Sequence, residues 1–210
     1  MALVVIGGHA RRVGKTSVVA GLISALPDLG WTAVKITQHG HKLDSGNGAA
    51  SHSASVNVNY SWTIYEERDR SGESDTSRFL AAGAARALLL QAEAGRLAEA
   101  MLALRARIAD AANVIIESNS VLNFLRPDLY LMVLDPANAD FKDSAREFFD
   151  RADAVILHES GGPAWQGVVL NPVAGRPVFR IKPPNYVTPE LVDFVRLRLS
   201  APLAAETAGM

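Results

Sequence analysis

The chain is organised around its N-terminal segment, which reads Val4-Val5-Ile6-Gly7-Gly8-His9-Ala10-Arg11-Arg12-Val13-Gly14-Lys15-Thr16-Ser17. An unbroken apolar run ends in two glycines, as expected for a central parallel strand that is covered on both faces. A helix is then predicted from about Lys15 to Ala25, because apolar residues share one face and Pro27 ends the pattern. The segment therefore predicts a strand, a loop and a helix in succession.

A loop between a strand and a helix can surround phosphate oxygens with backbone N–H groups, and the helix dipole adds its positive end. The residues predicted to contact a nucleotide are Gly8, Ala10, Arg11, Arg12, Val13, Gly14, Lys15, Thr16 and Ser17. Lys15 would bridge the terminal phosphates, and the Thr16 hydroxyl would bind Mg²⁺. The pattern G-x-x-x-x-G-K-[ST] needs a glycine at His9, whereas Gly8 lies one place earlier.

Composition narrows the class of protein. The 210 residues are 49% hydrophobic and 20% charged, which is typical of one soluble globular domain. A net charge of −1 gives no reason to expect a nucleic acid or an acidic membrane as partner. Without cysteine, disulfides and thiolate metal sites are excluded, and without a signal peptide or an apolar run of spanning length the expected location is the cytoplasm.

Repeated apolar strands separated by amphipathic helices predict a single-domain α/β fold over 1–200, with a mostly parallel sheet and helices on both faces. The expected strands are 3–6, 31–37, 87–90, 113–119, 128–135, 154–157, 168–170 and 178–181. The expected helices are 15–25, 75–84, 95–109, 144–149 and one that begins after Thr188. Residues 201–210 are expected to form a flexible tail.

The stretch at about 39–72 is interpreted as an inserted loop or hairpin beside the phosphate site, and it could act as a lid. Alternating residues 56–60 predict a half-exposed strand, with 62–65 as its hairpin partner or its continuation. His39, His41, Asp44 and His52 have a spacing that is weakly specific for a metal. Solvated or phosphate-facing histidines are the favoured interpretation, although Asp44 stays a candidate ligand of Mg²⁺.

Ligands of such sheets bind at the carboxyl ends of the strands, which lie on one rim. Five candidates fall at strand ends there: His9, Lys35, Glu117, Asp135 and His158. Glu117 matches the carboxylate that holds Mg²⁺ directly or through water, and a helix cap or a solvated acid is the alternative. Lys35, taken as the end of its strand, could reach a terminal phosphate or a substrate carboxylate, or could be a solubilising edge residue.

These residues resemble a branch of P-loop proteins that contains dethiobiotin synthetase, the ParA/MinD-type ATPases and the molybdopterin-guanine dinucleotide biosynthesis protein B family. Gly8 to Thr16 repeat the dethiobiotin synthetase frame, while Ala10 replaces the signature lysine of the MinD type, which argues against a partitioning ATPase. The protein B family is the more similar one. Its pattern is matched by Lys35-Ile36-Thr37-Gln38-His39-Gly40-His41, Asp75-Thr76-Ser77-Arg78, Ala82-Gly83-Ala84 and Ile115-Ile116-Glu117.

The resemblance implies a Mg²⁺-dependent GTP- or ATP-binding protein with weak NTPase activity, in which Lys15, Lys35 and Glu117 are catalytic. The ligands of Mg²⁺ would come from Thr16, with Glu117 or Asp44. It also implies a molybdenum-cofactor enzyme or another protein as partner, and it allows a homodimer. Two departures are the long 41–75 segment and Ser118-Asn119-Ser120 where the family usually has glycine.

Two alternatives remain. One is an ATP-dependent small-molecule ligase or kinase of dethiobiotin-synthetase type, with Lys35 holding the acceptor, and the other is a binding module without catalysis. The choice between ATP and GTP is left open because no N-K-x-D tetrad is present and His158 stands where its Asn would be. Leu170-Asn171-Pro172 and Lys182-Pro183-Pro184-Asn185 are alternative contacts to the base.

Overall fold

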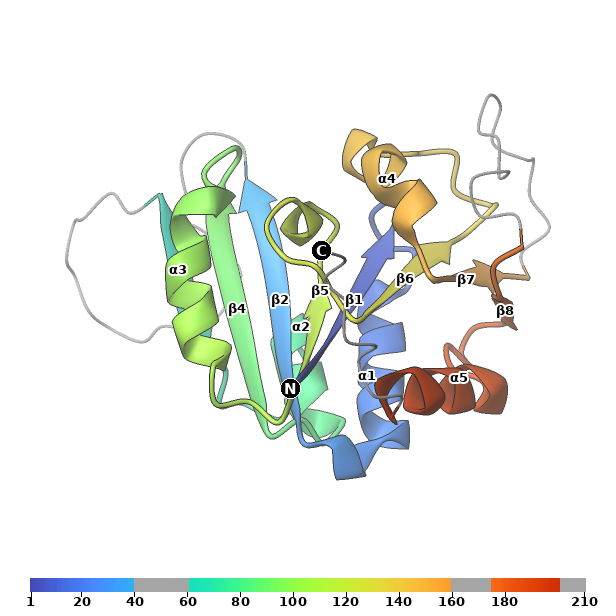
Figure 1. The fold of residues 1–210 in the computed structure, drawn as a ribbon, viewed down its shortest axis with the longest axis horizontal. Helices are drawn as coiled ribbons and strands as arrows, with labels where there is room; N and C mark the ends of the chain where they lie inside the picture. Colours follow the sequence, from blue (N-terminus) through green and yellow to red (C-terminus); the bar gives the residue numbers. More distant parts are fainter. Residues whose placement is uncertain (40–60, 160–174, 201–210) are drawn as a thin grey trace, which may run out of the picture.

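The computed structural model describes residues 1–39, 61–159 and 175–200, which form one sheet and the helices around it (Figure 1). The strands are β1 (Ala2–Gly8), β2 (Trp31–His39), β3 (Trp62–Glu66), β4 (Arg86–Glu93), β5 (Asn113–Glu117), β6 (Leu129–Leu134), β7 (Ala154–His158) and β8 (Val178–Ile181). The helices are α1 (Lys15–Ala25), α2 (Asp75–Ala81), α3 (Leu97–Ile108), α4 (Asp143–Phe148) and α5 (Pro189–Ser200). Short 3₁₀ turns lie at Pro27–Leu29, Ser120–Asn123 and Phe149–Arg151.

The described strands are arranged in the order β3-β4-β2-β5-β1-β6-β7-β8. All neighbouring pairs are parallel except β3 with β4, which are antiparallel. β1 lies between β5 and β6 and is buried along nearly its whole length, as a central strand covered on both faces must be. The predicted single-domain, mostly parallel α/β sheet is therefore confirmed.

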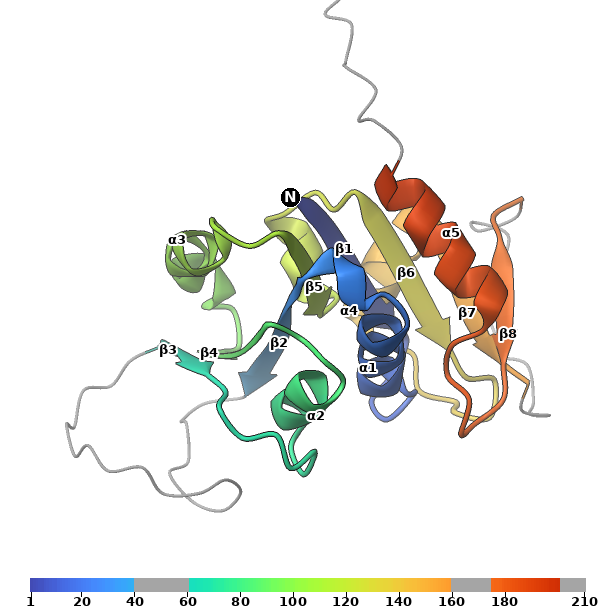
Figure 2. The same ribbon diagram turned by 90° about the horizontal axis from the view of Figure 1, so that it is seen from below.

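Helices cover both faces of the sheet, and each face has its own apolar core. Val4 and Ile6 of β1 point toward α1, α2 and α5, whereas Leu3 and Val5 point toward α3 and α4. This division follows from the two-residue period of a strand, which sends successive side chains to opposite faces. α1 and α2 lie side by side on their face (Figure 2).

The helix predictions are confirmed where the apolar period is strong. α1 has the predicted bounds, Lys15 to Ala25, and it buries Val18, Val19, Leu22 and Ile23 as its predicted face. α3 buries its predicted stripe, Leu97, Met101, Leu104 and Ile108. At the start of α5, the Thr188 hydroxyl accepts a hydrogen bond from the Leu191 N–H at 3.4 Å, so the predicted N-cap is present.

The place of Lys35 in its strand needs correction. β1 and β2 are parallel, as expected in a mostly parallel sheet, and β5 lies between them. β2 does not end at Lys35 and extends past the predicted end at residue 37, because its ladder with β4 continues through Thr37 opposite Gln91 to His39 opposite Glu93. Lys35 therefore lies in the middle of its strand, and it reaches the rim because its other neighbour, β5, ends opposite it at Glu117.

The predicted insertion is described only in part. Trp62–Glu66 is a strand as expected, yet its partner is β4, on the antiparallel edge of the sheet. The strand predicted over 56–60, Asp44 with the neighbouring histidines His41 and His52, the strand predicted over 168–170 and the tail 201–210 lie outside the described residues. Among the described residues, no helix has the length and apolar content that crossing a membrane requires.

Candidate functional site

The loop between β1 and α1 adopts a backbone conformation that surrounds an anion. Gly14 has φ 85° and Arg12 has φ 59°, so two left-handed residues alternate with their neighbours along the loop. Successive N–H groups in such an arrangement converge on one point. In the described part of the chain, no backbone carbonyl accepts from the N–H groups of residues 10–17. The loop can therefore offer these donors to phosphate oxygens.

Glycine is required at both ends of this loop. A Cβ at Gly8 would lie 2.9 Å from side-chain atoms of Lys15 and of Val13. A Cβ at Gly14 would lie 2.4 Å from the Tyr186 ring, in addition to the strain of its positive φ. The displaced first glycine of the sequence pattern thus has a structural role where it stands, because it lets the Lys15 side chain pass close to the strand.

Lys15 bends back over the loop. Its Nζ donates to the Ala10 carbonyl at 2.9 Å. Burial lowers the pKa of the Lys15 ammonium from 10.5 to about 8, and the carboxylate of Glu117 opposes that shift. A buried ammonium held by one carbonyl gains a stronger partner when an anion enters the loop. The position is consistent with its predicted contact to terminal phosphates.

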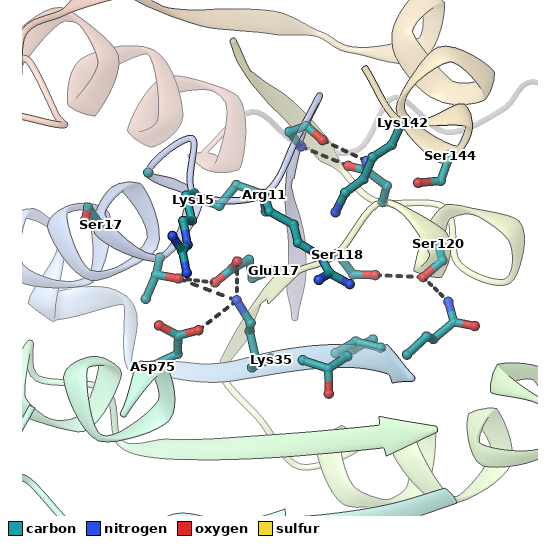
Figure 3. Close-up of a pocket in the computed structure, with 18 of the residues that line it drawn as sticks. Arg11, Lys15, Ser17, Lys35, Asp75, Glu117, Ser118, Ser120, Lys142 and Ser144 are labelled. Atoms are coloured by element: carbon teal, nitrogen blue, oxygen red, sulfur yellow. Dashed lines mark hydrogen bonds and ion pairs between the residues drawn. The ribbon is translucent and has the colours of Figure 1, made fainter. Parts of the chain in front are cut away.

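Four side chains from separate elements converge in front of the loop (Figure 3). The Thr16 hydroxyl donates to Glu117 Oε2 at 2.8 Å. Lys35 Nζ pairs with Glu117 Oε1 and lies 3.0 Å from Asp75 Oδ2, at the start of α2. The carboxylate of Glu117 is almost completely buried, so the two contacts replace the water that it loses. The sheet register explains this convergence, because Ile6 of β1 and Lys35 of β2 are both opposite Glu117.

The oxygens of this cluster suit Mg²⁺. Mg²⁺ prefers oxygen ligands, keeps several waters and takes one or two protein ligands together with substrate phosphates. Thr16 and Glu117 supply a hydroxyl and a carboxylate next to the loop. Within the described ranges, no group of three or more histidine or acidic side chains gathers to form a cage for a metal. The donor set therefore fits an ion that is shared with phosphate.

The side chain of Asn119 holds the beginning of the loop. Asn119 Oδ1 accepts from the Gly8 N–H at 2.9 Å, and Asn119 Nδ2 donates to the Gly8 carbonyl at 2.9 Å. The amide thus pairs with Gly8 as a neighbouring strand would, just beyond the end of β5. Gly7 leaves room for it, since a Cβ there would lie 2.4 Å from Asn119 Oδ1. Asn119 is a residue that sequence reasoning missed.

Two buried histidines support the loop. His158 Nε2 lies 3.0 Å from the Val13 carbonyl, and its ring contacts Tyr186 edge-on. His9 packs edge-on against Phe141, and burial lowers the pKa of its imidazole from 6.5 to about 4. Both histidines lie at strand ends as predicted. Their contacts position the backbone of the loop.

The loop, the cluster in front of it and Asn119 border one cavity of about 730 Å³, whereas His9 and His158 lie behind its wall. Its lining is rich in cations, namely Arg11, Arg12, Lys15, Lys35, Arg78 and Lys142, whereas the acids that line it are Asp75 and Glu117. Hydroxyl and amide side chains of Gln38, Ser118 and Ser120 form the part of the wall beyond β5. A cavity with this charge is suited to a polyanion.

The structure brings together most of the predicted site. Gly8, Arg11, Arg12, Gly14, Lys15, Thr16, Ser17, Lys35 and Glu117 line the cavity. Ala10 and Val13 are buried, and their carbonyls hold Lys15 and His158. Asp44 lies outside the described residues. Lys182 and Asn185, the alternative base contacts that are described, do not line the cavity, although the nearby Tyr186 does.

Sequence reasoning assigned no role to Arg78 or Lys142. Arg78 projects from α2, and its Nη2 donates to the Ser17 hydroxyl at 3.0 Å. Lys142 lies just before α4, and its N–H donates to the His9 carbonyl at 2.8 Å. Arg78 belongs to a segment that the sequence pattern had already singled out, whereas Lys142 carries no local signal. Its position depends on how the chain after β6 folds back onto the loop.

Comparisons with known proteins give weak likenesses. No protein-family model matches the sequence, and no curated protein matches it. Among solved structures, LpxK from Aquifex aeolicus, in complex with ATP, is 20% identical with a TM-score of 0.47; the match covers 86% of this chain and 53% of that chain. HypB from Helicobacter pylori, in complex with nickel, is 14% identical with a TM-score of 0.47, and the match covers 94% of this chain and 85% of that chain. The chain thus spans about half the length of LpxK.

Proposed function

We propose that this chain is a Mg²⁺-dependent nucleotide-binding protein with weak NTPase activity. The observation that carries the proposal is the cluster of Thr16, Lys35 and Glu117 in front of a glycine-bearing loop that lines the same cavity. Backbone N–H groups of residues 10–16 would hold the α- and β-phosphates, and Lys15 would leave the Ala10 carbonyl for the β- and γ-phosphates.

The side chains would divide the remaining tasks between them. Thr16 and Glu117 would hold Mg²⁺, which when bound neutralises developing charge on the phosphates. Lys35, which has Asp75 as its second partner at 3.0 Å, would turn toward the terminal phosphate. Lys35 and Arg78 would then stabilise the charge that grows as the phosphoryl group is transferred, which is the main demand of this reaction on a protein.

The resemblance to the molybdopterin-guanine dinucleotide biosynthesis protein B family supports a narrower version of this proposal. In it the protein binds GTP or ATP as an adaptor for a molybdenum-cofactor enzyme or another protein partner in the cytoplasm, as a homodimer. Turnover that rises only when a protein partner is added would support this version. Turnover that rises only with a small molecule would contradict it.

The direct test of nucleotide binding is Lys15→Ala. We expect ATP or GTP with Mg²⁺ to raise the melting temperature of the wild-type protein, since a ligand at about 100 times its Kd stabilises the folded state by about 2.7 kcal/mol. Lys15→Ala should lose this shift and show no heat of binding by calorimetry. Arg107→Ala, which removes an exposed cation from the far end of α3, is the matched control and should bind normally.

Unchanged nucleotide affinity in Lys15→Ala would contradict the proposal. A melting shift that is equal with and without Mg²⁺ would contradict the metal-binding role of Thr16 and Glu117. Running ATP and GTP in parallel also decides the base, which neither the loop nor the cluster determines.

A second function is favoured by the residues that line the cavity beyond Glu117. Beyond Glu117 the cavity continues along Gln38, Ser118 and Ser120, which leaves room beside the terminal phosphate for an acceptor molecule. An ATP-dependent small-molecule ligase or kinase would use that room. Release of ADP that depends on one member of a panel of carboxylates, amines or alcohols would support this function, and turnover indifferent to every member would contradict it.

A further inference from the structure

The phosphate loop is tied to the chain that follows β6 by two hydrogen bonds. The Lys142 N–H donates to the His9 carbonyl at 2.8 Å, and Asn138 Nδ2 donates to the Arg11 carbonyl at 3.3 Å. These bonds hold the backbones of Arg11 and Lys142 close together at one side of the cavity. Figure 3 shows both side chains reaching into the cavity on the side away from Asp75 and Lys35.

The charges on this side are not balanced as they are in front of the loop. Lys35 has the carboxylates of Glu117 and Asp75 within 3.0 Å or less. In the part of the chain that the structure describes, neither Arg11 nor Lys142 forms an ion pair with a carboxylate. Burial lowers the pKa of the Lys142 ammonium, the positive charges of Arg11 and Lys35 lower it further, and the carboxylates of Glu117 and Asp140 act in the opposite direction. An anion between Arg11 and Lys142 would offset both the burial and the repulsion.

Hydrogen-bonding groups complete the same region. The Ser118 and Ser120 hydroxyls lie 3.2 Å apart, and Gln38 Nε2 donates to the Ser120 hydroxyl at 2.8 Å. Ser118, Ser120 and Arg11 all line the same cavity (Figure 3). The hydroxyl network can orient a polar molecule whose charge is held by the two cations. The nucleotide site has its own cations in Lys15, Lys35 and Arg78, so this group is additional to it.

We infer that Arg11 and Lys142, with Ser118 and Ser120, form a subsite for a small anionic molecule, bearing a carboxylate or a phosphate group, that binds beside the terminal phosphate of the nucleotide. The inference rests on the proposed function, because it names the class of molecule that would bind in the cavity next to the γ-phosphate of the bound nucleotide. Carboxylate and phosphate share the oxygen geometry that an arginine fork recognises, so the experiment separates them.

The experiment is a titration of the wild-type protein that has first been saturated with Mg²⁺ and a non-hydrolysable analogue of the nucleotide it binds. Inorganic phosphate and succinate are titrated in separate arms, and binding heat is measured. We expect saturable binding in at least one arm. The arm that binds identifies the charged group of the ligand.

Lys142→Ala should weaken that binding about tenfold or more, because one charge-assisted hydrogen bond is worth about 1.5–3 kcal/mol. Arg11→Gln should have a similar effect, and Lys142→Arg should restore most of the affinity. Nucleotide affinity should stay unchanged in Lys142→Ala, since Lys142 is assigned no contact with the nucleotide. Arg107→Ala is the control for loss of one exposed positive charge.

The inference is overturned if neither probe binds with a Kd below about 10 mM, which corresponds to about 2.7 kcal/mol, or if Lys142→Ala binds the probe as well as the wild type does. Its failure is distinguishable from failure of the nucleotide site. If the wild type binds no nucleotide, the titration is repeated on nucleotide-free Lys15→Ala protein. Phosphate binding that survives Lys15→Ala and is lost in Lys142→Ala would then support the subsite without the proposed function.

Discussion

The two sides of the cavity hold similar cations in opposite circumstances. Lys35 lies on a central strand, with one buried and one half-exposed carboxylate beside it. Lys142 lies on the connection between β6 and α4, is only partly covered, and forms no ion pair among the described residues; the cations Arg11 and Lys35 and the acids Glu117 and Asp140 act on it from beyond contact distance. The first lysine is part of a network that the folded state completes by itself. The second lysine lies where an anion from solution could supply the missing charge. The Lys35 side of the cavity therefore stabilises the fold, and the Lys142 side is suited to bind a ligand.

The largest expected effect comes from breaking the complete network. Lys35→Ala leaves Glu117 buried with the Thr16 hydroxyl as its main donor, and loss of one partner of a buried ion pair costs about 3–5 kcal/mol. Lys142→Ala should change the free energy of unfolding by only about 0.5 kcal/mol in either direction. Urea unfolding of both variants checks this contrast. Equal losses of unfolding free energy in the two variants would contradict the proposed difference between the Lys35 and Lys142 sides of the cavity.

A smaller effect is expected from the loss of Asn119, which holds the beginning of the loop. Asn119→Ala leaves the N–H and the carbonyl of Gly8 without their side-chain partner, and an unsatisfied buried polar group costs about 1–3 kcal/mol. Asn123→Ala is the matched control, because that exposed amide makes a single bond at 3.4 Å. The measurement is again urea unfolding, combined with nucleotide affinity, which should fall in Asn119→Ala only.

The pH dependence of nucleotide binding reports on Lys15. Its pKa is lowered to about 8, so the free protein loses the Lys15 charge as the pH rises through that value. A bound polyanion would stabilise the charged form, so affinity should fall about tenfold between about pH 7 and about pH 9, with one proton taken up per nucleotide bound at the upper end. Calorimetry in buffers of different ionisation enthalpy measures both quantities. Lys15→Arg, which stays charged, should show no such fall if it binds.

The smallest effect concerns repulsion on the unbalanced side. Salt screens exposed charges over about 8 Å at physiological ionic strength, so added sodium chloride should stabilise the wild type by a few tenths of a kcal/mol through Arg11 and Lys142. Lys142→Ala should lose that gain. Thermal unfolding at about 20 mM and about 200 mM salt measures it. If both proteins respond equally to salt, repulsion between Arg11 and Lys142 is not the cause of the response.

Residues that carry local signals were predicted well from the sequence. α1 starts at Lys15 and ends at Ala25 because Gly14 can adopt a positive φ and the apolar spacing stops before Pro27. Gly14-Lys15-Thr16 and Glu117 were identified because each follows a strongly apolar strand. The end of β2 was predicted at residue 37, two residues too early, because Gln38 and His39 are polar. Their ladder with β4 keeps them in the sheet, and no local pattern records that pairing.

Residues that act through distant partners could not be found in this way. Asn119 and Gly8 are 111 positions apart. Nothing in the sequence near either residue indicates that the Asn119 side chain bonds to both the N–H and the carbonyl of Gly8. Lys142 occupies a polar connection that reads as ordinary surface. It reaches the cavity only because its backbone bonds to His9.

By itself the sequence determined the strand–loop–helix unit, the candidate phosphate and metal residues, and a mostly parallel α/β sheet. These follow from periodicity and from glycine, which act over a few neighbouring residues. Only the tertiary structure decided that β5 lies between β1 and β2, which puts Glu117 between Ile6 and Lys35. Hydrogen bonds between strands set that register. They join residues about 80 to 110 positions apart, beyond the reach of any local pattern.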